Sequence, residues 1–571
     1  MARRITALTL VLLVVLGGWL AFRAYQLQRE LGAARRTLQG LGATLTSDDQ
    51  GKLERDLAEA RQHVSVAGSA VNDPVWRLAS AVPVAGRSFL VARRGTAAVR
   101  SVLTDVVPPA RQAADLVRAR PLLAGGVVDV GRVAALEPKV ADALRASESV
   151  QREVQATGTR WLPRRVADQQ RQLERRVDEL VSGLRAVTAA VRVAPGMLGA
   201  QGARRYFVAV QNNAEARGTG GIIGAYAILR ADHGRIIRER VGTDRDLVEQ
   251  PAPLVDLGPE YAEQYDRQSG RTVWTAAVIT PNWPSAAQVV ASLWSGQGGG
   301  RIDGVIGVDP LAMAQILGAT GPVSFDTRTI GADNVADFVM RDEYALFQNR
   351  EVERQRVLAD LAGALFDSVI RGTASSTSLI RAFGRSGAQG HLQVYSARVQ
   401  EQSVFAPLRV SGELPGTPGA FLEVVSNNAA GNKADYYVRR RVGYERLAAG
   451  RARVTVTLRN LVQPAAVPPI VIGRLDRPAR PPEPGATRQV LSLVVGVGAR
   501  VREVLVDGRP ATYESGTERG HGWATVQVEI SPSRPTVVTA EVDDGGGSLT
   551  YRQQPLVVDD DLDLRVPHRI G

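Results

Sequence analysis

The segment YFVAVQNNAEARGTGGIIGAYAIL, residues 206–229, places two amides, a carboxylate, a guanidinium and a group of glycines between two apolar runs. The polar residues are Asn212, Asn213, Glu215 and Arg217, and the glycines after them include Gly220 and Gly221. Glycine permits positive φ and a close approach to a ligand, and successive N–H groups in such a turn can bind an anion. The arginine could hold a phosphate by two hydrogen bonds, while the carboxylate and amides could orient a metal ion or a hydroxyl. A second interpretation fits equally well: a tight turn whose asparagine side chains bond to the backbone.

A second group of polar residues lies in the segment MRDEYALFQNREVERQR. Arg350, Arg354 and Gln355 fall on neighbouring helical positions, because residues i and i+4 share a helix face. The alternative is a solvated charged face on which Glu351 and Glu353 are the internal partners of the arginines.

Several common catalytic sites are excluded by the motifs that the sequence lacks. A Walker A loop is absent, because the lysines are Lys52, Lys139 and Lys433 and none of them follows a glycine-rich loop. No H-E-x-x-H or G-x-S-x-G motif occurs and the histidines are scattered, which argues against hydrolytic zinc and serine–histidine chemistry. The chain has no cysteine and therefore no thiolate metal site. The glycines near Arg217 precede a strand-like run, whereas a dinucleotide site needs them to open a helix.

Strands and helices alternate around the first segment, which predicts an α/β sandwich over residues 200–412. RYFVAVQ predicts a buried strand, and IIGAYAILRADHGRIIRERV predicts a hairpin with its turn at Asp232-His233-Gly234. RIDGVIGVDPLAMAQILGATGPVSF predicts strand, helix and strand, with Asp309 as the helix N-cap and Pro310 in the first position.

Alternating apolar residues between Pro and Gly turns predict a β-sandwich of about seven strands over residues 418–560. Within it, the stretch SNNAAGNKADYY, which begins at Ser426, echoes the stretch QNNAEARGTGG, which begins at Gln211.

The N-terminal segment contains an uncharged run, Ile5–Phe22, directly after two arginines. At about 1.5 Å per residue this run nearly spans a hydrocarbon core of roughly 30 Å, so residues 1–25 are predicted to be a transmembrane anchor. Trp19 and Phe22 stand where a cleaved signal peptide would have small residues, which favours an uncleaved anchor. Long domains translocate largely regardless of flanking charge. The sequence therefore predicts a single-pass protein of the plasma membrane whose bulk is extracytoplasmic.

Heptad patterns predict a helical stalk or bundle over residues 26–195. One seam begins at Leu27, and a second runs from Val166 to Val191 through Gln170, Leu173, Val177, Leu180, Leu184 and Val187. Asp73-Pro74 predicts an N-cap and the first position of a helix between the two seams. The predicted fold class is thus α+β multidomain, with a transmembrane helix, a helical stalk, an α/β sandwich core and a C-terminal β-sandwich.

The net charge is +12, and almost all basic residues are arginines. Such a surface attracts phosphates, acidic glycopolymers or anionic lipid headgroups. No dense basic tract with interleaved aromatic residues occurs, so nucleic-acid binding is not expected.

Three segments, YFVAVQNNAEARGTGGIIGAYAILRADHGRI, RIDGVIGVDPLAMAQILGATGPV and SNNAAGNKADYYVRRRV, closely resemble the DUF4012 family of uncharacterised bacterial envelope proteins. The resemblance covers nearly the whole chain after the N-terminal segment. It implies an envelope protein but carries over no established activity.

The order of strand, arginine-containing turn, strand, VDP…LGATGPV and ERQRVL resembles, more distantly, the LytR-CpsA-Psr family. Those proteins are membrane-anchored phosphotransferases that move glycopolymers from polyprenyl-pyrophosphate carriers to the cell wall. The resemblance implies phosphate-binding roles for Arg217 and for the pair Arg354-Gln355, and a Mg²⁺ site with carboxylates from the first turn.

The chain departs from the LytR-CpsA-Psr pattern at its acidic positions. Asn212 and Asn213 replace the acid expected in the first turn, with only Glu215 nearby, and Gly218-Thr219-Gly220 stands where a second acid is expected. Glu351 stands where that family has an arginine, and Arg350 is displaced by one position.

Because these acids are missing, the sequence favours a membrane-anchored protein of cell-envelope polysaccharide assembly that binds a phosphate-bearing, lipid-linked glycan in the α/β core without clear catalysis. The alternative is a Mg²⁺-dependent glycopolymer phosphotransferase in which Arg217, Arg350 and Arg354 stabilise phosphate charge and Glu215 holds the metal ion or acts as base. The third hypothesis is a structural spacer of the cell wall.

Overall fold

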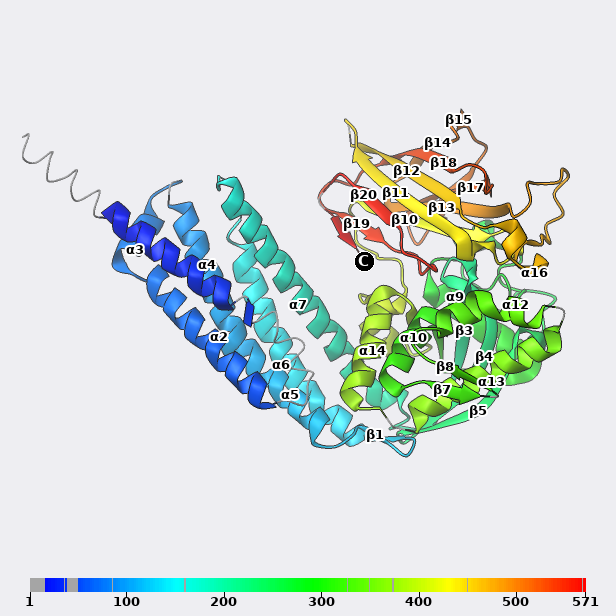
Figure 1. Cartoon of the computed structure of the whole chain (residues 1–571), viewed down its shortest axis with the longest axis horizontal. Helices are drawn as coiled ribbons and strands as arrows, with labels where there is room; N and C mark the ends of the chain where they lie inside the picture. The colour runs from blue at the N-terminus through cyan, green and yellow to red at the C-terminus, as the bar shows by residue number, and fades with distance from the viewer. Residues whose placement is uncertain are drawn as a thin grey trace, which may run out of the picture. The chain divides into compact units, whose positions relative to one another are not determined.

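The computed structural model describes residues 16–34, 36–37, 50–84, 86–158, 161–325, 327–348, 350–371, 374–448, 450–566 and 568–570. The chain forms two compact units, the first made of Met1–Leu122 and Asp129–Pro195 and the second of Leu123–Val128 and Gly196–Gly571 (Figure 1). The first unit is helical and the second combines helices with sheets, so the chain is an α+β multidomain protein.

The transmembrane helix in the predicted fold class is wrong. Among the described residues, no helix is long and apolar enough to cross a membrane. Residues 16–34 are helical, but this helix carries charged residues such as Arg23 and Glu30, and Leu27 is buried in a cluster with other helices. The described part of the predicted anchor therefore belongs to an amphipathic helix of the bundle. Residues 1–15 of the predicted anchor lie outside the described residues.

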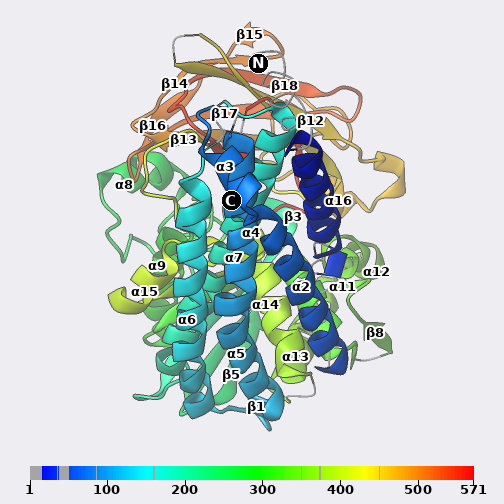
Figure 2. The same cartoon turned by 90° about the vertical axis from the view of Figure 1, so that its left-hand side faces the viewer.

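The helices of the first unit pack into a bundle. They are α2 (Gln50–Val71), α3 (Pro74–Ala81), α4 (Arg87–Ser101), η1 (Val102–Val106), α5 (Val107–Ala119), α6 (Val130–Gln155) and α7 (Arg164–Met197). Figure 2 shows α2, α4, α5, α6 and α7 alongside one another. Asp73 caps α3 by accepting the Val75 N–H at 2.9 Å, and Pro74 occupies the first position, as the sequence predicts.

The buried stripe of α7 follows the predicted seam only in its first half. Gln170 and Val177 are buried, but Val181 and Thr188 then continue the stripe, while Val187 is exposed. An α-helix has 3.6 residues per turn, so a stripe drifts away from a strict seven-residue repeat as the helix lengthens.

A mixed seven-stranded sheet, in the order β1-β2-β5-β4-β3-β6-β9, is the centre of the second unit. Its strands are β1 (Leu123–Ala124), β2 (Val127–Val128), β3 (Arg204–Arg217), β4 (Gly220–Asp232), β5 (Arg235–Thr243), β6 (Gly304–Val308) and β9 (Leu392–Ser396). β3 and β6 are parallel, and the other neighbours are antiparallel. The predicted hairpin turn is confirmed, because His233 and Gly234 both have positive φ between β4 and β5.

Helices cover both faces of this sheet. Phe207 and Ala209 of β3 face one apolar cluster, together with α9 (Trp283–Trp294). Val208 and Val210 face the other, together with α10 (Pro310–Thr320), α12 (Glu343–Phe347) and α13 (Glu351–Ile370). Alternate side chains of one strand thus fill two cores, as the pleat of a buried strand requires. Asp309 caps α10 as predicted, accepting the N–H groups of Leu311 and Ala312.

Further helices and strands complete this part of the chain. They are α8 (Pro259–Tyr265), α11 (Val335–Asp337), α14 (Ser376–Gln389), α15 (Val399–Phe405), α16 (Pro469–Ile472), β7 (Val323–Phe325) and β8 (Arg328–Ile330), with α16 in the β-rich part that follows.

Two six-stranded sheets follow and enclose one apolar core. The first contains β16 (Glu514–Glu518), β17 (His521–Ile530), β13 (Thr487–Val497), β10 (Phe421–Asn428), β19 (Leu549–Arg552) and β21 (His568–Ile570). The second contains β15 (Arg509–Pro510), β14 (Val501–Val506), β18 (Thr536–Asp543), β12 (Arg451–Asn460), β11 (Val438–Arg446) and β20 (Asp561–Leu564). The sequence predicts fewer strands, because strands as short as β15 or β21 leave too few residues for an alternating pattern.

Candidate functional site

Strand β3 has a bulge at the asparagine motif, shortly before its end. Its pairing with β4 is regular at Asn212 and resumes only at Ala216, so residues 213–215 are left out of the ladder. Asn212 Oδ1 accepts the N–H of Ala214 at 3.0 Å. This is the asparagine–backbone bond of the tight-turn interpretation.

The glycines of the motif allow the chain to approach its own backbone. A Cβ on Gly221 would lie 2.1 Å from the Asn212 carbonyl oxygen, and one on Gly218 would lie 2.3 Å from that of Ile279. Gly220 has a φ of +138°, a conformation that disfavours residues with a side chain. The close approach that these glycines allow is therefore an intramolecular contact of the fold.

Glu215 is clamped between two cations. Arg217 Nη2 donates to its Oε1 at 2.8 Å, and Lys433 Nζ contacts its Oε2. The Glu215 residue is only 5% exposed. Burial acts to raise the pKa of Glu215, but the charges of Lys433 and Arg217 outweigh it and hold this pKa below its usual value. The carboxylate is therefore ionised and has both oxygens engaged.

Arg217 uses its guanidinium inside the molecule. Besides the bond to Glu215, Nε donates to the Thr275 carbonyl at 2.9 Å. Nη1 donates to the carbonyl oxygens of Ala216 at 2.9 Å and Asn428 at 3.2 Å. Arg217 is 7% exposed. A phosphate would have to displace several of these bonds to reach it.

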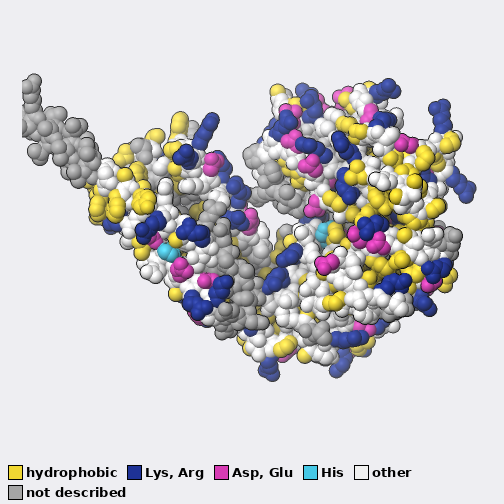
Figure 3. Space-filling view, in the orientation of Figure 1, with side chains coloured by type: hydrophobic (Ala, Val, Ile, Leu, Met, Phe, Trp, Pro, Cys, Tyr) yellow, Lys and Arg dark blue, Asp and Glu magenta, His cyan; other side chains and the backbone are white. Residues whose placement is uncertain are grey.

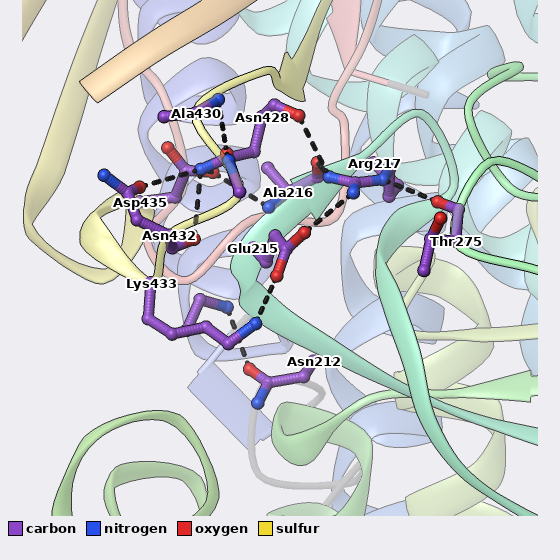
Figure 4. Close-up of polar contacts among 12 residues, drawn as sticks. Asn212, Glu215, Ala216, Arg217, Thr275, Asn428, Ala430, Asn432, Lys433 and Asp435 are labelled. Carbon is purple, nitrogen blue, oxygen red and sulfur yellow. Dashed lines mark hydrogen bonds and ion pairs between the residues drawn. The ribbon is translucent and has the colours of Figure 1, made fainter. Parts of the chain in front are cut away.

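The partners of this strand end come from the echoing stretch of the β-sandwich (Figure 4). Gly218 N–H donates to Asn427 Oδ1 at 2.9 Å, and Ala216 N–H donates to Asp435 Oδ2 at 2.9 Å. Asn428 Nδ2 donates to the same Asp435 oxygen at 2.8 Å. The two asparagine motifs thus interlock, and we call this buried network the joint.

The two motifs also use the same local device. Asn428 Oδ1 accepts the N–H groups of Ala430 and Gly431 at 3.0 and 2.8 Å, just as Asn212 Oδ1 accepts that of Ala214. In both motifs the asparagine at the strand end closes a turn and leaves backbone groups free for the opposite motif.

Asn213 points into a separate buried polar group. Its Nδ2 donates to Asp309 Oδ2 at 3.1 Å and to the Pro555 carbonyl at 3.0 Å. Asp309 also lies 2.6 Å from Nδ1 of His391. Burial acts to lower the pKa of His391, but the Asp309 carboxylate raises it above its ordinary value. Asn213 therefore connects the helix cap of α10 to the β-sandwich.

Arg354 and Gln355 lie in a second network, at the start of α13. Arg354 Nη1 donates to Glu343 Oε1 at 2.9 Å, and its Nε and Nη2 hold Glu351 at 2.9 and 2.6 Å. Gln355 Nε2 donates to the same Glu351 at 3.1 Å. Hydrogen bonds from Arg354 lower the pKa of Glu351 to about 2. These contacts agree with the alternative given for this segment, in which glutamates are the internal partners of the arginines.

Glu343 is the buried acid of this second network. The residue is fully buried, and its Oε2 has no hydrogen-bond partner among the described residues. Burial raises the pKa of Glu343 to about 7, although the Arg354 charge acts in the opposite direction. A neighbour, Tyr344, accepts a 3.0 Å hydrogen bond from Asn212 Nδ2. The second network thus touches the joint, but Arg354 and Arg217 share no hydrogen-bond partner in the described part of the chain.

Arg350 stands apart from both networks. It is exposed, donates to Glu353 at 2.8 Å, and lines a surface pocket of about 550 Å³ with Glu351, Val352, Glu353 and Arg356. Arg356 is also exposed, and no ion pair of it is found among the described residues. This pocket is accessible and presents two arginines beside two glutamates.

The predicted Mg²⁺ does not fit the residues near Glu215. Both carboxylate oxygens of Glu215 already contact cations. In the part of the chain that the structure describes, no group of three or more His, Cys, Asp or Glu residues could hold a metal ion. A hard cation with oxygen ligands needs several such groups around it.

Three important residues escaped the sequence analysis. Lys433 and Asp435 bond to β3 from the β-sandwich, and His391 pairs with the cap of α10. The available signals were the echo between the two asparagine stretches and the rarity of lysine in an arginine-rich chain. His391 gives no such signal, because its partner lies far from it in the sequence.

The second unit thus consists of an α/β sandwich that a buried polar network joins to a two-sheet β-sandwich, and its described residues contain no group of three or more His, Cys, Asp or Glu that could hold a metal ion. Residues 201–344 match the model of the DUF4012 family, described as "Protein of unknown function". The predicted resemblance is confirmed over this range, which includes β3, β4 and Glu343. The resemblance to the LytR-CpsA-Psr family stays a prediction. No curated protein and no solved structure is significantly similar to the chain.

Proposed function

We propose that the chain is a non-catalytic protein of cell-envelope polysaccharide assembly that binds a phosphate-bearing, lipid-linked glycan. The observation that carries the non-catalytic part is that the charged groups of the joint already bond to one another and to the backbone. Glu215 is held between Arg217 and Lys433, and the guanidinium of Arg217 also donates hydrogen bonds to carbonyl oxygens. The envelope setting is supported by the net charge of +12 and by the resemblance of the sequence to envelope proteins.

The pocket beside α13 supports the binding part of the proposal. Its volume, about 550 Å³, lies within the range of roughly 300–1,000 Å³ of small-ligand pockets. Arg350 and Arg356 place two guanidinium groups on it, and guanidinium groups suit phosphate oxygens. Val352 is 76% exposed and offers apolar surface to a sugar face or a prenyl chain. The glycan ligand is therefore assigned to this pocket rather than to the strand end.

Phosphotransfer is the weaker proposal for physical reasons. It requires cations aimed at the transferred group and a metal ion or base beside it. Arg217 and Arg354 hold different carboxylates, and Glu215 has no free oxygen. A catalytic role would require the joint to open.

Titration calorimetry of the full-length chain with geranylgeranyl pyrophosphate tests the proposal. We expect Arg350→Ala with Arg356→Ala to weaken binding about 10- to 100-fold, since a hydrogen bond to a charged group contributes about 1.5–3 kcal/mol. Arg371→Ala is the matched control, because Arg371 is exposed at the other end of α13.

Two measurements separate the three hypotheses: whether phosphate is released, and whether wild type and the variants bind the pyrophosphate. Release of phosphate with Mg²⁺ that is lost in Glu215→Gln would overturn the non-catalytic proposal in favour of the phosphotransferase. If wild type and both variants fail to bind the pyrophosphate, the binding proposal fails and the spacer hypothesis is preferred.

A further inference from the structure

One end of the helical unit exposes a group of large apolar side chains. They are Trp19, Phe22 and Tyr25 of the helix at residues 16–34, and Leu78, Val82 and Val84 of α3 and the turn after it, each between 42% and 73% exposed. Figure 3 shows hydrophobic side chains gathered at this end of the unit, where Figure 1 places α3. We call these six residues the apolar face.

The two elements that carry the apolar face are fastened together. Trp19 Nε1 donates to Asp73 Oδ1 at 3.2 Å, and Arg23 Nη2 donates to Asp73 Oδ2 at 3.2 Å. Asp73 is also the N-cap of α3. Beneath them, Leu27 and Trp76 are buried in one apolar cluster. The exposed side chains therefore project from two elements that are packed against each other, and they form a fixed surface.

Val84, in the turn after α3, is exposed and has an uncommon backbone conformation. Val84 has a φ of +63°, which is rare for a β-branched residue. The residue is 62% exposed, so no burial of its own side chain offsets the strain. Strain of this kind is often found at functional positions.

The segment that carries α3 is basic. Residues 74–104 contain no acidic residue but include Arg77, Arg87, Arg93 and Arg94. Two described acids belong to or adjoin the elements of the face, and both are paired: Asp73 with Arg23 and the Trp19 indole, and Glu30 with Arg29 and His63.

We propose that the apolar face docks on the surface of an anionic phospholipid bilayer. Tryptophan and tyrosine prefer the headgroup level of a membrane, and arginine side chains are attracted to anionic lipids. The sequence adds continuity, because the uncharged run that begins at Ile5 ends with Trp19 and Phe22, two residues of the face. A second copy of the chain would bring these same arginines together, so self-association is disfavoured by charge.

An environment-sensitive fluorophore on the face tests this docking. The chain has no cysteine, so Val84→Cys in the full-length protein can be labelled at one position with a nitrobenzoxadiazole dye. With vesicles that contain phosphatidylglycerol, we expect a blue shift and a severalfold rise in emission. The control, Ser182→Cys on the exposed side of α7, should not change. Vesicles of phosphatidylcholine alone should give a smaller rise, because the anionic attraction is absent.

A matched pair of apolar substitutions sharpens the test. Leu78→Ser with Val82→Ser should remove most of the rise at the labelled position, whereas Val187→Ser, an exposed valine of α7, should leave it intact. Circular dichroism confirms that each variant is folded. Unchanged emission of the Val84 label with anionic vesicles would overturn the proposal. A rise without lipid that grows with protein concentration would also overturn it and identify a second copy as the occupant.

Discussion

The joint and the pocket beside α13 use the same residue type in opposite ways. At the joint, Arg217 is buried, bonded to Glu215 and to three carbonyl oxygens, and fixed by two parts of the chain. At the pocket, Arg356 is exposed and no ion pair of it is found among the described residues. The difference teaches that an arginine near a glycine-rich turn indicates a phosphate site only if its donors remain free.

The largest expected effect comes from Arg217→Ala. Removing one partner of a buried ion pair costs about 3–5 kcal/mol, because the remaining groups lose their compensation. We expect a loss at the lower end of this range, since Lys433 still contacts Glu215. Urea unfolding followed by tryptophan fluorescence measures the loss. The control is Arg356→Ala, which should change stability by less than about 0.5 kcal/mol. Equal losses in the two variants would contradict the contrast between joint and pocket.

The next effect is expected at Gly221. A methyl group there would meet the Asn212 carbonyl at 2.1 Å, and backbone cannot move aside as a flexible side chain can. Overpacking of this kind costs about 1–3 kcal/mol. Gly224→Ala on the same strand meets nothing within 4 Å and should be neutral. A thermal melt of both variants checks the prediction, which fails if Gly221→Ala melts with wild type.

Asn428→Ala should weaken the joint from the side of the β-sandwich. The substitution leaves the Ala430 and Gly431 N–H groups without their acceptor, and it removes one of the two hydrogen bonds to Asp435 Oδ2. An unsatisfied buried group costs about 1–3 kcal/mol. Gln400→Ala, at an exposed position on α15, is the control for loss of a side-chain amide. Denaturant melts should separate the two variants, and a coincident pair of curves would show that the joint does not need Asn428.

The smallest effect is a pH dependence from Glu343. Its pKa of about 7 lies above the ordinary carboxyl value, so the folded state binds more protons than the unfolded state between those values. The contribution of Glu343 to stability is therefore complete below the ordinary pKa and is lost as pH rises through about 7. Glu343→Gln should flatten the fall in stability between pH 5 and pH 8 by an amount on the order of 1–3 kcal/mol.

Glu351→Gln is the control for this slope. Its pKa of about 2 keeps the carboxylate ionised throughout the same window, so its loss should leave the slope unchanged. If the two glutamine variants give the same pH profile as wild type, Glu343 does not titrate as its burial implies.

Local signals in the sequence predict the fold better than they predict the joint. The caps at Asp73 and Asp309 and the hairpin turn at His233 depend on neighbours within a few residues, and the structure has all of them. The contacts of Arg217 with Asn428 and of Glu215 with Lys433 join positions more than 200 residues apart. No periodicity or cap can indicate such a pair, and the echo of the asparagine stretches gave no partner.

The transmembrane prediction failed for a related reason. Hydropathy over Ile5–Phe22 ignores the residues that follow, and the helix at residues 16–34 continues through Arg23 and Glu30 into the bundle. In the described part of the chain this helix packs against α2 and α3. A hydropathy window covers only neighbouring residues and therefore does not include these contacts.

The long separation across the joint sets an order of events during synthesis. Arg217 and Asn428 are 211 residues apart. At a synthesis rate of roughly 5–20 residues per second, Asn428 is added about 10–40 seconds after Arg217. During that interval Glu215 and Arg217 lie open to water, and Gln554, which also holds the Arg217 carbonyl, arrives later still. The α/β layer of a nascent chain therefore carries an unfinished edge, available to chaperones, until the last strands are complete.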